Sequence, residues 1–226
     1  MKREVLANTY VGDKAESYDS KRTSSKKWRH EQDVVHRILA SLPHGITLID
    51  VPVGTGRFIE FYRELGIAAS GVDISNDMIA RAREKAESLG FEIDLLQGSI
   101  FEIPAADGSY DCAFCMRLLN WLSLADVELA LRELFRVSDR FVVVGIRMKS
   151  DDISFLNRFK VAGEGFWRKF LSRKRSRNKI TVHDKSNIQS IFARLELRQV
   201  LSAAIDAGLR GTTYELFLLE KRPKLS

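Results

Sequence analysis

Residues 48–58 constrain the fold of this chain most, because they have the pattern of a buried strand that ends in an acid and turns through glycines into a helix. The apolar residues before Asp50 predict the strand, and Gly54 and Gly56 predict a tight turn. One strand-helix unit later, a second apolar run ends in Asp73. Ligands of open α/β sheets bind outside the carboxyl ends of the strands. The pattern therefore predicts an open α/β sheet with a nucleoside-binding crevice.

The glycine turn differs from a dinucleotide-binding fingerprint in two ways. The third glycine position holds Ile59, which follows the bulky Phe58. The start of the helix therefore carries large side chains where a dinucleotide site has a glycine for close packing under the pyrophosphate. Asp50 is expected at the mouth of the turn, where a carboxylate would repel phosphates and attract a cation. S-adenosylmethionine carries an ammonium and a sulfonium group and no phosphate. These residues favour it over a dinucleotide, with Asp73 accepting hydrogen bonds from the ribose hydroxyls.

The ordered set of acid, glycine turn and second acid resembles the class I S-adenosylmethionine-dependent methyltransferases, from about Tyr18 to the C-terminus. The family motif is an acid followed by three alternating glycines. Asp50, Gly54 and Gly56 fit it, whereas Pro52 replaces the first glycine. Proline fixes φ at about −65° and lacks an N–H, so the turn here would be rigid. The resemblance implies a doubly wound, Rossmann-like sheet of seven strands, mostly parallel with an antiparallel last strand, and helices on both faces.

The resemblance also implies a binding site for S-adenosyl-L-methionine, with S-adenosyl-L-homocysteine as the product. Asp73 matches the ribose-binding acid, and residues 97–100 match the segment that lines the adenine. Many members have an Asp where this chain has Ser99, a weaker acceptor, so adenine contact would depend more on Ile100. The residues expected to contact the cofactor are Tyr18, Trp28, Asp50, Val51, Pro52, Gly54, Thr55, Gly56, Arg57, Phe58, Asp73, Ile74, Met78, Gly98, Ser99, Ile100, Cys115 and Met116.

The alternation of strand and helix patterns predicts a mostly parallel sheet, and the resemblance implies a single methyltransferase domain over residues 1–226. A chain of 226 residues with 45% hydrophobic content can bury the core of one such domain. Strands are expected at residues 46–51, 68–73, 92–96, 110–115, 141–146, 196–205 and 212–221, the last two as a hairpin. Helices are expected at residues 57–65, 76–89, 118–137 and 184–193.

An N-terminal cap is expected at residues 1–42, because family members often fold such a segment over the cofactor. Tyr18 and Trp28 could then shield the methyl donor from water. An equally good alternative is that Trp28 anchors the first helix to the sheet.

A basic insertion at residues 148–180 follows the fifth expected strand and would border the ligand crevice as a lid. Seven basic residues lie within 168–179, and without them the formal charge of +6 would become −1. Such a local patch suggests a local anionic partner. Two alternatives stay open, namely a solvated loop and a helix that contacts a membrane surface.

The catalytic residues are unknown from the sequence. Methyl transfer from a sulfonium is an in-line displacement from an activated donor, and many such enzymes need no obligatory base. His183 is a candidate because it ends a strand-like run after the insertion, although a helix-capping or surface histidine is the more common case. Arg117, with Asn120, could hold an acidic substrate or the cofactor carboxylate, or else form a salt bridge and a helix cap.

Cysteine usage and hydropathy suit a cytoplasmic protein. Cys112 and Cys115 would point to opposite faces of a strand, so neither a disulfide nor a shared metal site is expected, and no metal is predicted. Sparse cysteine is typical of a reducing compartment. The sequence shows no signal-peptide core and no apolar run long enough to span a bilayer.

The absence of certain motifs reduces the range of possible methyl acceptors. Residues 115–118 read Cys-Met-Arg-Leu where an Asn-Pro-Pro-Tyr-like tetrapeptide would indicate amino methylation of DNA bases or glutamine. No Pro-Cys or Thr-Cys pair offers the nucleophile for cytosine C5 methylation. The first hypothesis is O- or N-methylation of a small, anionic metabolite or glycan-type conjugate. The alternatives are an RNA methyltransferase that uses the basic insertion, and a catalytically silent cofactor-binding partner subunit, suggested by Pro52 and Ser99. The oligomeric state stays open.

Overall fold

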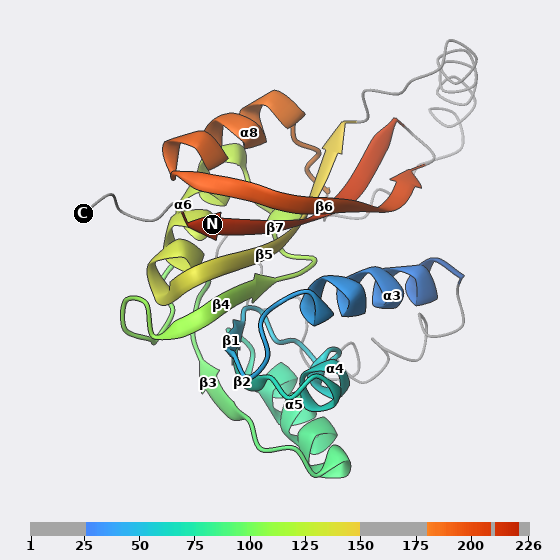
Figure 1. Cartoon of the computed structure of the whole chain (residues 1–226), viewed down its shortest axis with the longest axis vertical. Coiled ribbons are helices and arrows are strands. Elements are labelled where there is room, and N and C mark those ends of the chain that lie inside the picture. The colour runs from blue at the N-terminus through green and yellow to red at the C-terminus, as the bar shows by residue number, and fades with distance from the viewer. Residues whose placement is uncertain (1–25, 150–179, 209–210, 222–226) are drawn as a thin grey trace, which may run out of the picture.

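The computed structural model describes residues 26–149, 180–208 and 211–221, which form one seven-stranded sheet with helices on both faces (Figure 1). The strands are β1 (Thr47–Asp50), β2 (Ala68–Asp73), β3 (Asp94–Gln97), β4 (Tyr110–Cys115), β5 (Ser138–Lys149), β6 (Leu197–Gly208) and β7 (Thr212–Lys221). The helices are α3 (Lys26–Ala40), α4 (Ile59–Glu64), α5 (Asn76–Leu89), α6 (Leu124–Val137) and α8 (Lys185–Arg194), with a 3-10 turn, η1 (Leu119–Trp121), before α6.

The strands lie in the order β3-β2-β1-β4-β5-β7-β6. Strands β1 to β5 pair in parallel, whereas β7 runs antiparallel to both β5 and β6. The chain first adds strands on one side of β1 and then crosses to the other side with β4, so the order reverses between β1 and β4. The predicted fold class and the final hairpin are therefore confirmed, and the reversal marks the place where a crevice is expected.

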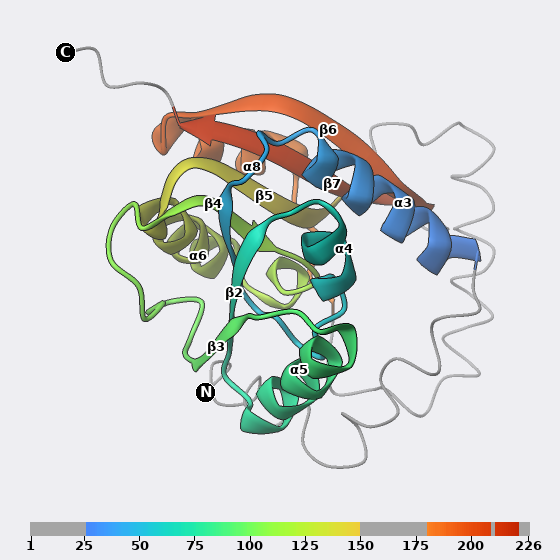
Figure 2. The same ribbon diagram turned by 60° about the horizontal axis from the view of Figure 1, so that its bottom comes forward.

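Different helices cover the two faces of the sheet, as Figure 2 shows. Helices α3, α4 and α5 enclose one apolar core with Leu48 and Phe114. Helices α6 and α8 enclose the other core with Ile49. Neighbouring residues of β1 join different cores because successive strand side chains point to opposite faces. The same alternation separates the buried thiols of Cys112 and Cys115, as predicted.

Local sequence signals explain where α5 begins and ends. The Ser75 hydroxyl accepts a hydrogen bond from the Met78 N–H at 3.4 Å, which caps the first turn. Gly90 ends the helix in the left-handed conformation, with φ 60°. The helix bounds agree with the sequence-based prediction.

One predicted helix is wrong. Residues 118–137 do not form a continuous helix, because η1 ends at Trp121, the backbone of Leu122 is extended, and α6 starts anew after Ser123. The Ser123 hydroxyl accepts the Asp126 N–H at 3.2 Å and caps this second start. The break leaves a short turn at the carboxyl end of β4, close to the reversal of strand order.

Several further bounds differ from the prediction, among them those of α4 and β5. Helix α4 begins at Ile59 rather than at residue 57, since residues 51–58 continue the turn. Strand β5 extends to Lys149 because β7 pairs with it along almost its whole length, from Phe141 with Glu220 to Lys149 with Thr212. The sequence pattern of β5 alone could not show this partner.

Several predictions fall on residues that the structure does not describe. Tyr18 and most of the expected N-terminal cap, and nearly all of the expected basic insertion, lie outside the described residues. The described part of the cap is α3, whose Val35 and Leu39 are buried in the core that α4 and α5 share. None of the helices in the described ranges is long and apolar enough to cross a bilayer.

Candidate functional site

Two cavities lie side by side at the carboxyl ends of β1, β2 and β4. They share four wall residues, which are Pro52, Asp73, Ile74 and Leu118. The larger cavity is also lined by Val53, Gly54, Thr55, Arg57, Phe58, Ser75, Met78, Met116, Arg117 and Trp121. The smaller cavity is also lined by Val51, Val72, Gly98, Ser99, Ile100 and Phe101. Together they occupy the edge where the strand order reverses, which is the predicted position of the crevice.

Asp73 stands between the two cavities and is only 6% exposed. One carboxylate oxygen accepts the Gly54 N–H at 3.0 Å and the other accepts the Ser75 N–H at 2.9 Å. Burial raises the pKa of Asp73 above its ordinary value, although these N–H donors act in the opposite direction. A carboxylate has about four acceptor positions, so Asp73 can hold the loop and still accept from a ligand.

Asp50 does not stand at the mouth of the turn, and this prediction is wrong. The residue is 1% exposed, lines neither cavity, and accepts a hydrogen bond from the Tyr62 hydroxyl at 2.8 Å. Its other carboxylate oxygen is buried without a hydrogen-bond partner among the described residues. Burial raises the pKa of Asp50 well above its ordinary value. The acid that faces the crevice is therefore Asp73.

The two glycines of the turn have different roles. Gly54 has φ 58° and lines the larger cavity, and a Cβ there would meet nothing within 4 Å. Gly56 has φ 75°, and a Cβ there would lie 2.6 Å from the Ile59 side chain and 3.1 Å from the Ala82 backbone. Gly54 thus leaves open space beside the ligand, whereas Gly56 lets α4 close on α5. Pro52, after a cis peptide bond, lines both cavities.

Arg57 and Arg117, which both line the larger cavity, share one acid that the sequence analysis missed. Glu31 of α3 is 3% exposed, pairs with Arg57 at 3.1 Å and also binds Arg117. Burial alone would raise the pKa of Glu31, but the two guanidinium groups lower it below its ordinary value. An acid on the apolar face of an amphipathic helix, three residues before Val34, was the available signal.

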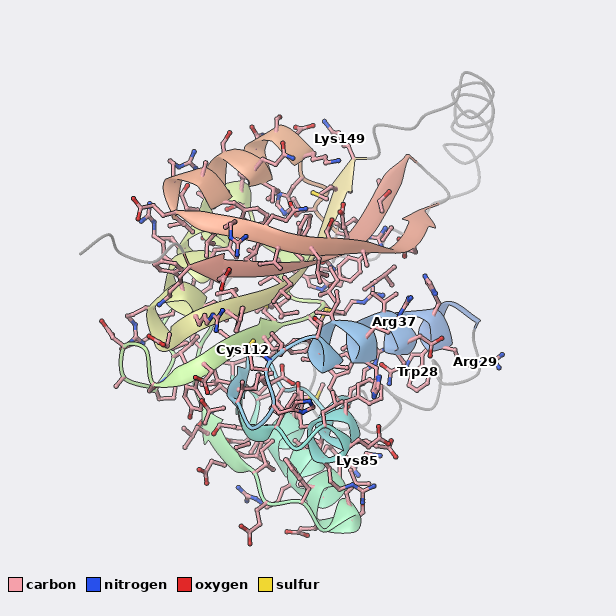
Figure 3. All side chains as sticks on the ribbon, viewed as in Figure 1. Trp28, Arg29, Arg37, Lys85, Cys112 and Lys149 are labelled. Atoms are coloured by element: carbon pink, nitrogen blue, oxygen red, sulfur yellow. The ribbon has the colours of Figure 1, made fainter. Side chains whose placement is uncertain are left out.

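Trp28 lies at the start of α3 (Figure 3). The Arg57 guanidinium lies over its ring, 5.2 Å from the ring centroid. Trp28 lines neither cavity, which agrees with the alternative that it anchors the first described helix. Cys115 is fully buried and also lines neither cavity, and burial raises its pKa far above the ordinary value. The predicted cofactor contacts of these two residues therefore stay predictions.

His183 is not positioned for catalysis. It is 4% exposed and lines neither cavity. Its backbone bonds with Arg147 and Lys149 beside the end of β5, and its ring Nε2 lies 3.3 Å from the Leu119 carbonyl oxygen. Burial lowers the pKa of His183 below its ordinary value. The residue is thus neither a surface histidine nor a helix cap, but a buried support for η1.

The smaller cavity brings together the segment predicted to contact adenine. Gly98, Ser99 and Ile100 line it, next to Ile74. The Ser99 hydroxyl accepts a hydrogen bond from the Phe101 N–H at 3.2 Å, so it already has a partner within its own turn. Apolar side chains therefore provide much of this wall.

Thirteen of the residues predicted to contact the cofactor line the cavities, and Trp28, Asp50, Gly56 and Cys115 do not. The sequence analysis missed Ser75, Leu118 and Trp121, which could have been found as neighbours of the helix cap and of the end of β4. No cluster of three potential metal-binding His, Cys, Asp or Glu side chains occurs in residues 26–149, 180–208 and 211–221.

The crevice fits S-adenosylmethionine. Ile74 and Ile100 give the smaller cavity apolar walls for a purine, and Asp73 lies between the cavities, within reach of a nucleoside lodged across both. In the larger cavity, Gly54 leaves free space next to the apolar Phe58 and Met116.

Comparisons with known proteins agree with this geometry. Residues 48–140 match the family model of a methyltransferase domain. The malonyl-[acyl-carrier protein] O-methyltransferase of Pectobacterium atrosepticum is 31% identical over 104 residues, which are 45% of this chain and 39% of that protein. The demethylmenaquinone methyltransferase of Thermus thermophilus is 34% identical over 113 residues, which are 49% of each chain. This chain thus spans about half or less of the curated relatives that it matches.

The fold extends beyond the part with sequence similarity. The magnesium protoporphyrin IX methyltransferase of Synechocystis, solved with bound S-adenosylhomocysteine, superposes with a TM-score of 0.72 at 13% identity, over 97% of this chain and 99% of that one. The same enzyme solved with bound S-adenosylmethionine gives a TM-score of 0.71 at 12% identity, over 98% of each chain. Residues 48–140 are therefore similar to a methyltransferase domain, and the chain has the fold of these solved S-adenosylmethionine-dependent methyltransferase structures.

Proposed function

We propose that this chain is an S-adenosylmethionine-dependent methyltransferase that modifies an oxygen or nitrogen atom of a small acceptor. The observation that carries the proposal is the pair of adjoining cavities on either side of Asp73, at the reversal of strand order. When bound, the cofactor supplies a methyl group already activated on a sulfonium. The similarity of residues 48–140 to a methyltransferase domain supports this assignment.

The residues of the crevice would bind and orient the cofactor, and they would exclude water. Asp73 would hold the ribose, while Ile100 and Ile74 would pack on the adenine. Phe58, Met116 and Trp121 line the larger cavity, and such apolar walls keep water from the reacting atoms. This arrangement suits a reaction whose catalysis rests on alignment.

Proton transfer is a smaller part of this account. The ionisable side chains that line the two cavities are Asp73, Arg57 and Arg117, and both arginines are paired with Glu31. These groups are better suited to binding than to removing a proton at neutral pH. The acceptor would therefore be a nucleophile that needs no strong base.

The acceptor we propose is a small, anionic metabolite or a glycan-type conjugate. The support for its charge lies in the sequence, where seven basic residues fall within 168–179. The chain returns from that segment next to the crevice, because the Thr181 N–H donates to the Asn120 carbonyl at 2.7 Å, beside Trp121. Relatives act on acceptors as different as malonyl-acyl carrier protein and demethylmenaquinone, so they support the class of reaction rather than one acceptor.

Methyl-labelled S-adenosylmethionine tests this proposal. The protein is incubated with the labelled cofactor and with separate fractions of anionic metabolites, neutral metabolites and RNA. We expect label in the anionic small-molecule fraction. Label in RNA alone would show that the acceptor is RNA and not a small molecule. Cofactor binding without transfer to any fraction would favour a silent binding subunit.

A further inference from the structure

The turn at residues 116–118 forms a wall that the two cavities share. Met116 and Arg117 line the larger cavity, and Leu118 lines both. Arg117 has φ 61°, a left-handed conformation that is unfavourable for a residue with a Cβ. Such a conformation persists only where the surroundings hold it, and it is concentrated at functional sites. The contacts that hold Arg117 therefore bear on the shape of the crevice.

The main contact comes from Tyr214 on β7, 97 residues further along the chain. Tyr214 is fully buried, and its hydroxyl accepts the Arg117 N–H at 2.8 Å. The same hydroxyl lies 3.8 Å from the Met116 sulfur. The Arg117 guanidinium stacks on the Tyr214 ring, 4.1 Å from its centroid. One side chain thus contacts both the backbone and the side chains of the turn.

Gly145 on β5 provides the space for this hydroxyl. A Cβ at Gly145 would lie 2.1 Å from the Tyr214 hydroxyl oxygen and 2.8 Å from the Met116 sulfur. Any larger residue at this position would collide with both side chains. The absence of a side chain at Gly145 lets Tyr214 reach past β5 to the turn after β4.

Tyr214 and Arg117 are themselves held at their other ends. The Tyr214 N–H donates to an Asp206 carboxylate oxygen at 3.1 Å, and Asp206 pairs with Arg147 at 2.9 Å. The Arg117 guanidinium is bound by Glu31 of α3. The turn is therefore clamped between α3 on one side and the β6-β7 hairpin on the other.

We propose that Tyr214 is a positioning residue for methyl transfer, acting through the turn at residues 116–118. Its hydroxyl passes Gly145 and fixes Arg117 in the left-handed conformation, which sets the wall of the crevice against the cofactor. In-line displacement is sensitive to misplacement by about 1 Å, so a loosened wall would weaken alignment. This inference rests on the proposed function.

The test compares Tyr214→Phe in two backgrounds by calorimetric titration with S-adenosylhomocysteine. In the wild-type background, the Arg117 N–H loses its acceptor, and we expect affinity to fall roughly tenfold. In an Arg117→Gly background, glycine adopts the left-handed conformation unaided, so the same change should cost less than about threefold. Equal losses in both backgrounds would overturn the inference, as would no loss in either.

Two further variants keep the test independent of folding defects. Tyr110→Phe, at the opposite end of β4, is the matched control and should leave affinity unchanged. Gly145→Ala should lower affinity, because its Cβ would collide with the Tyr214 hydroxyl and with the Met116 sulfur; unchanged affinity would count against the inference. Thermal unfolding of each variant separates a loss of fold from a loss of affinity in the folded protein. A wild-type protein that does not bind S-adenosylhomocysteine would instead contradict the proposed function.

Discussion

The two halves of the sheet contribute to the crevice in different ways. The β1-β2 half contributes a contiguous loop and Asp73, whose contacts span at most 19 residues of sequence. The β5-β7-β6 half contributes almost no cavity lining, yet Tyr214 and Gly145 hold the turn after β4 from 97 and 28 residues away. One half therefore presents the binding groups, and the other fixes the wall opposite them.

This difference shows why a sequence motif identifies the ligand more easily than it identifies the residues that fix the wall of the crevice. The residues of the glycine loop are close together in the sequence. The supporting residues, Tyr214 and Gly145, come together only when the β6-β7 hairpin pairs with β5. Variants on each side should therefore fail differently. Changes in the loop half should weaken binding directly, and changes in the supporting groups should act through stability or geometry.

The largest effect is expected at Glu31, which ties α3 to the loop through Arg57 and to the turn after β4 through Arg117. Glu31→Gln removes the charge that Arg57 and Arg117 share, and breaking such a buried pair costs about 3 kcal/mol of unfolding free energy. Urea denaturation measures the loss. Glu84→Gln is the control, because Glu84 is 65% exposed in its pair with Arg81 and should change stability by less than about 0.5 kcal/mol. Equal losses in both variants would show that Glu31 does not tie α3 to the loop and the turn.

The next effect is expected at Asp73 and should appear in binding. Asp73→Ala removes the acceptor of the Gly54 and Ser75 N–H groups as well as the expected ribose contact. We expect affinity for S-adenosylhomocysteine to fall by about 2 kcal/mol. Asp94→Ala, at the far end of β3, is the control. Unchanged affinity in Asp73→Ala would show that the ribose is held elsewhere.

A pH-dependent effect is expected at Asp50, beneath the loop. Burial raises the pKa of Asp50 in the folded state, so between the ordinary value and the raised one the unfolded chain holds fewer protons. The stabilisation from protonated Asp50 is full below the ordinary pKa and is lost as pH rises through the folded pKa. The slope is about 1.4 kcal/mol per pH unit for one proton.

The variant Asp50→Asn removes this titration, so the stability difference from the wild type should change with pH between acidic and neutral conditions. Denaturation at a series of pH values measures that difference. A constant difference would mean that Asp50 keeps an ordinary pKa in the folded protein.

The smallest effect is expected at the cysteines, one on each face of the sheet. Cys112 and Cys115 are fully buried, and burial raises the pKa of each thiol far above the ordinary value. A thiol reagent should therefore react with neither in the folded protein and with both after denaturation. Rapid reaction in the folded state would show that one face of the sheet opens.

The sequence allowed the fold and much of the loop half to be predicted, for physical reasons. The strand patterns and the helix at residues 76–89 rest on local signals, and the structure confirms them. Asp50 and Asp73 have the same sequence context, yet one is buried under the loop and the other faces the crevice. The path of the loop decides between them, and no local pattern encodes that path.

The supporting residues, Tyr214 and Gly145, could not be predicted from local sequence patterns. Tyr214 lies in an ordinary alternating strand, and Gly145 lies within an apolar run with no turn signal. Their role arises because β7 pairs antiparallel with β5 and brings the tyrosine ring over the turn after β4. His183 shows the converse, since its position suggested catalysis and the fold buries it against Leu119.

Calorimetric titration of the wild-type chain with S-adenosylhomocysteine, and in parallel with a nicotinamide dinucleotide, tests the central claim most directly. The two ligands share an adenosine, and only the second has a pyrophosphate. We expect saturable binding of one S-adenosylhomocysteine per chain and no comparable binding of the dinucleotide. Binding of the dinucleotide in preference to S-adenosylhomocysteine, or no binding of S-adenosylhomocysteine, would contradict the account.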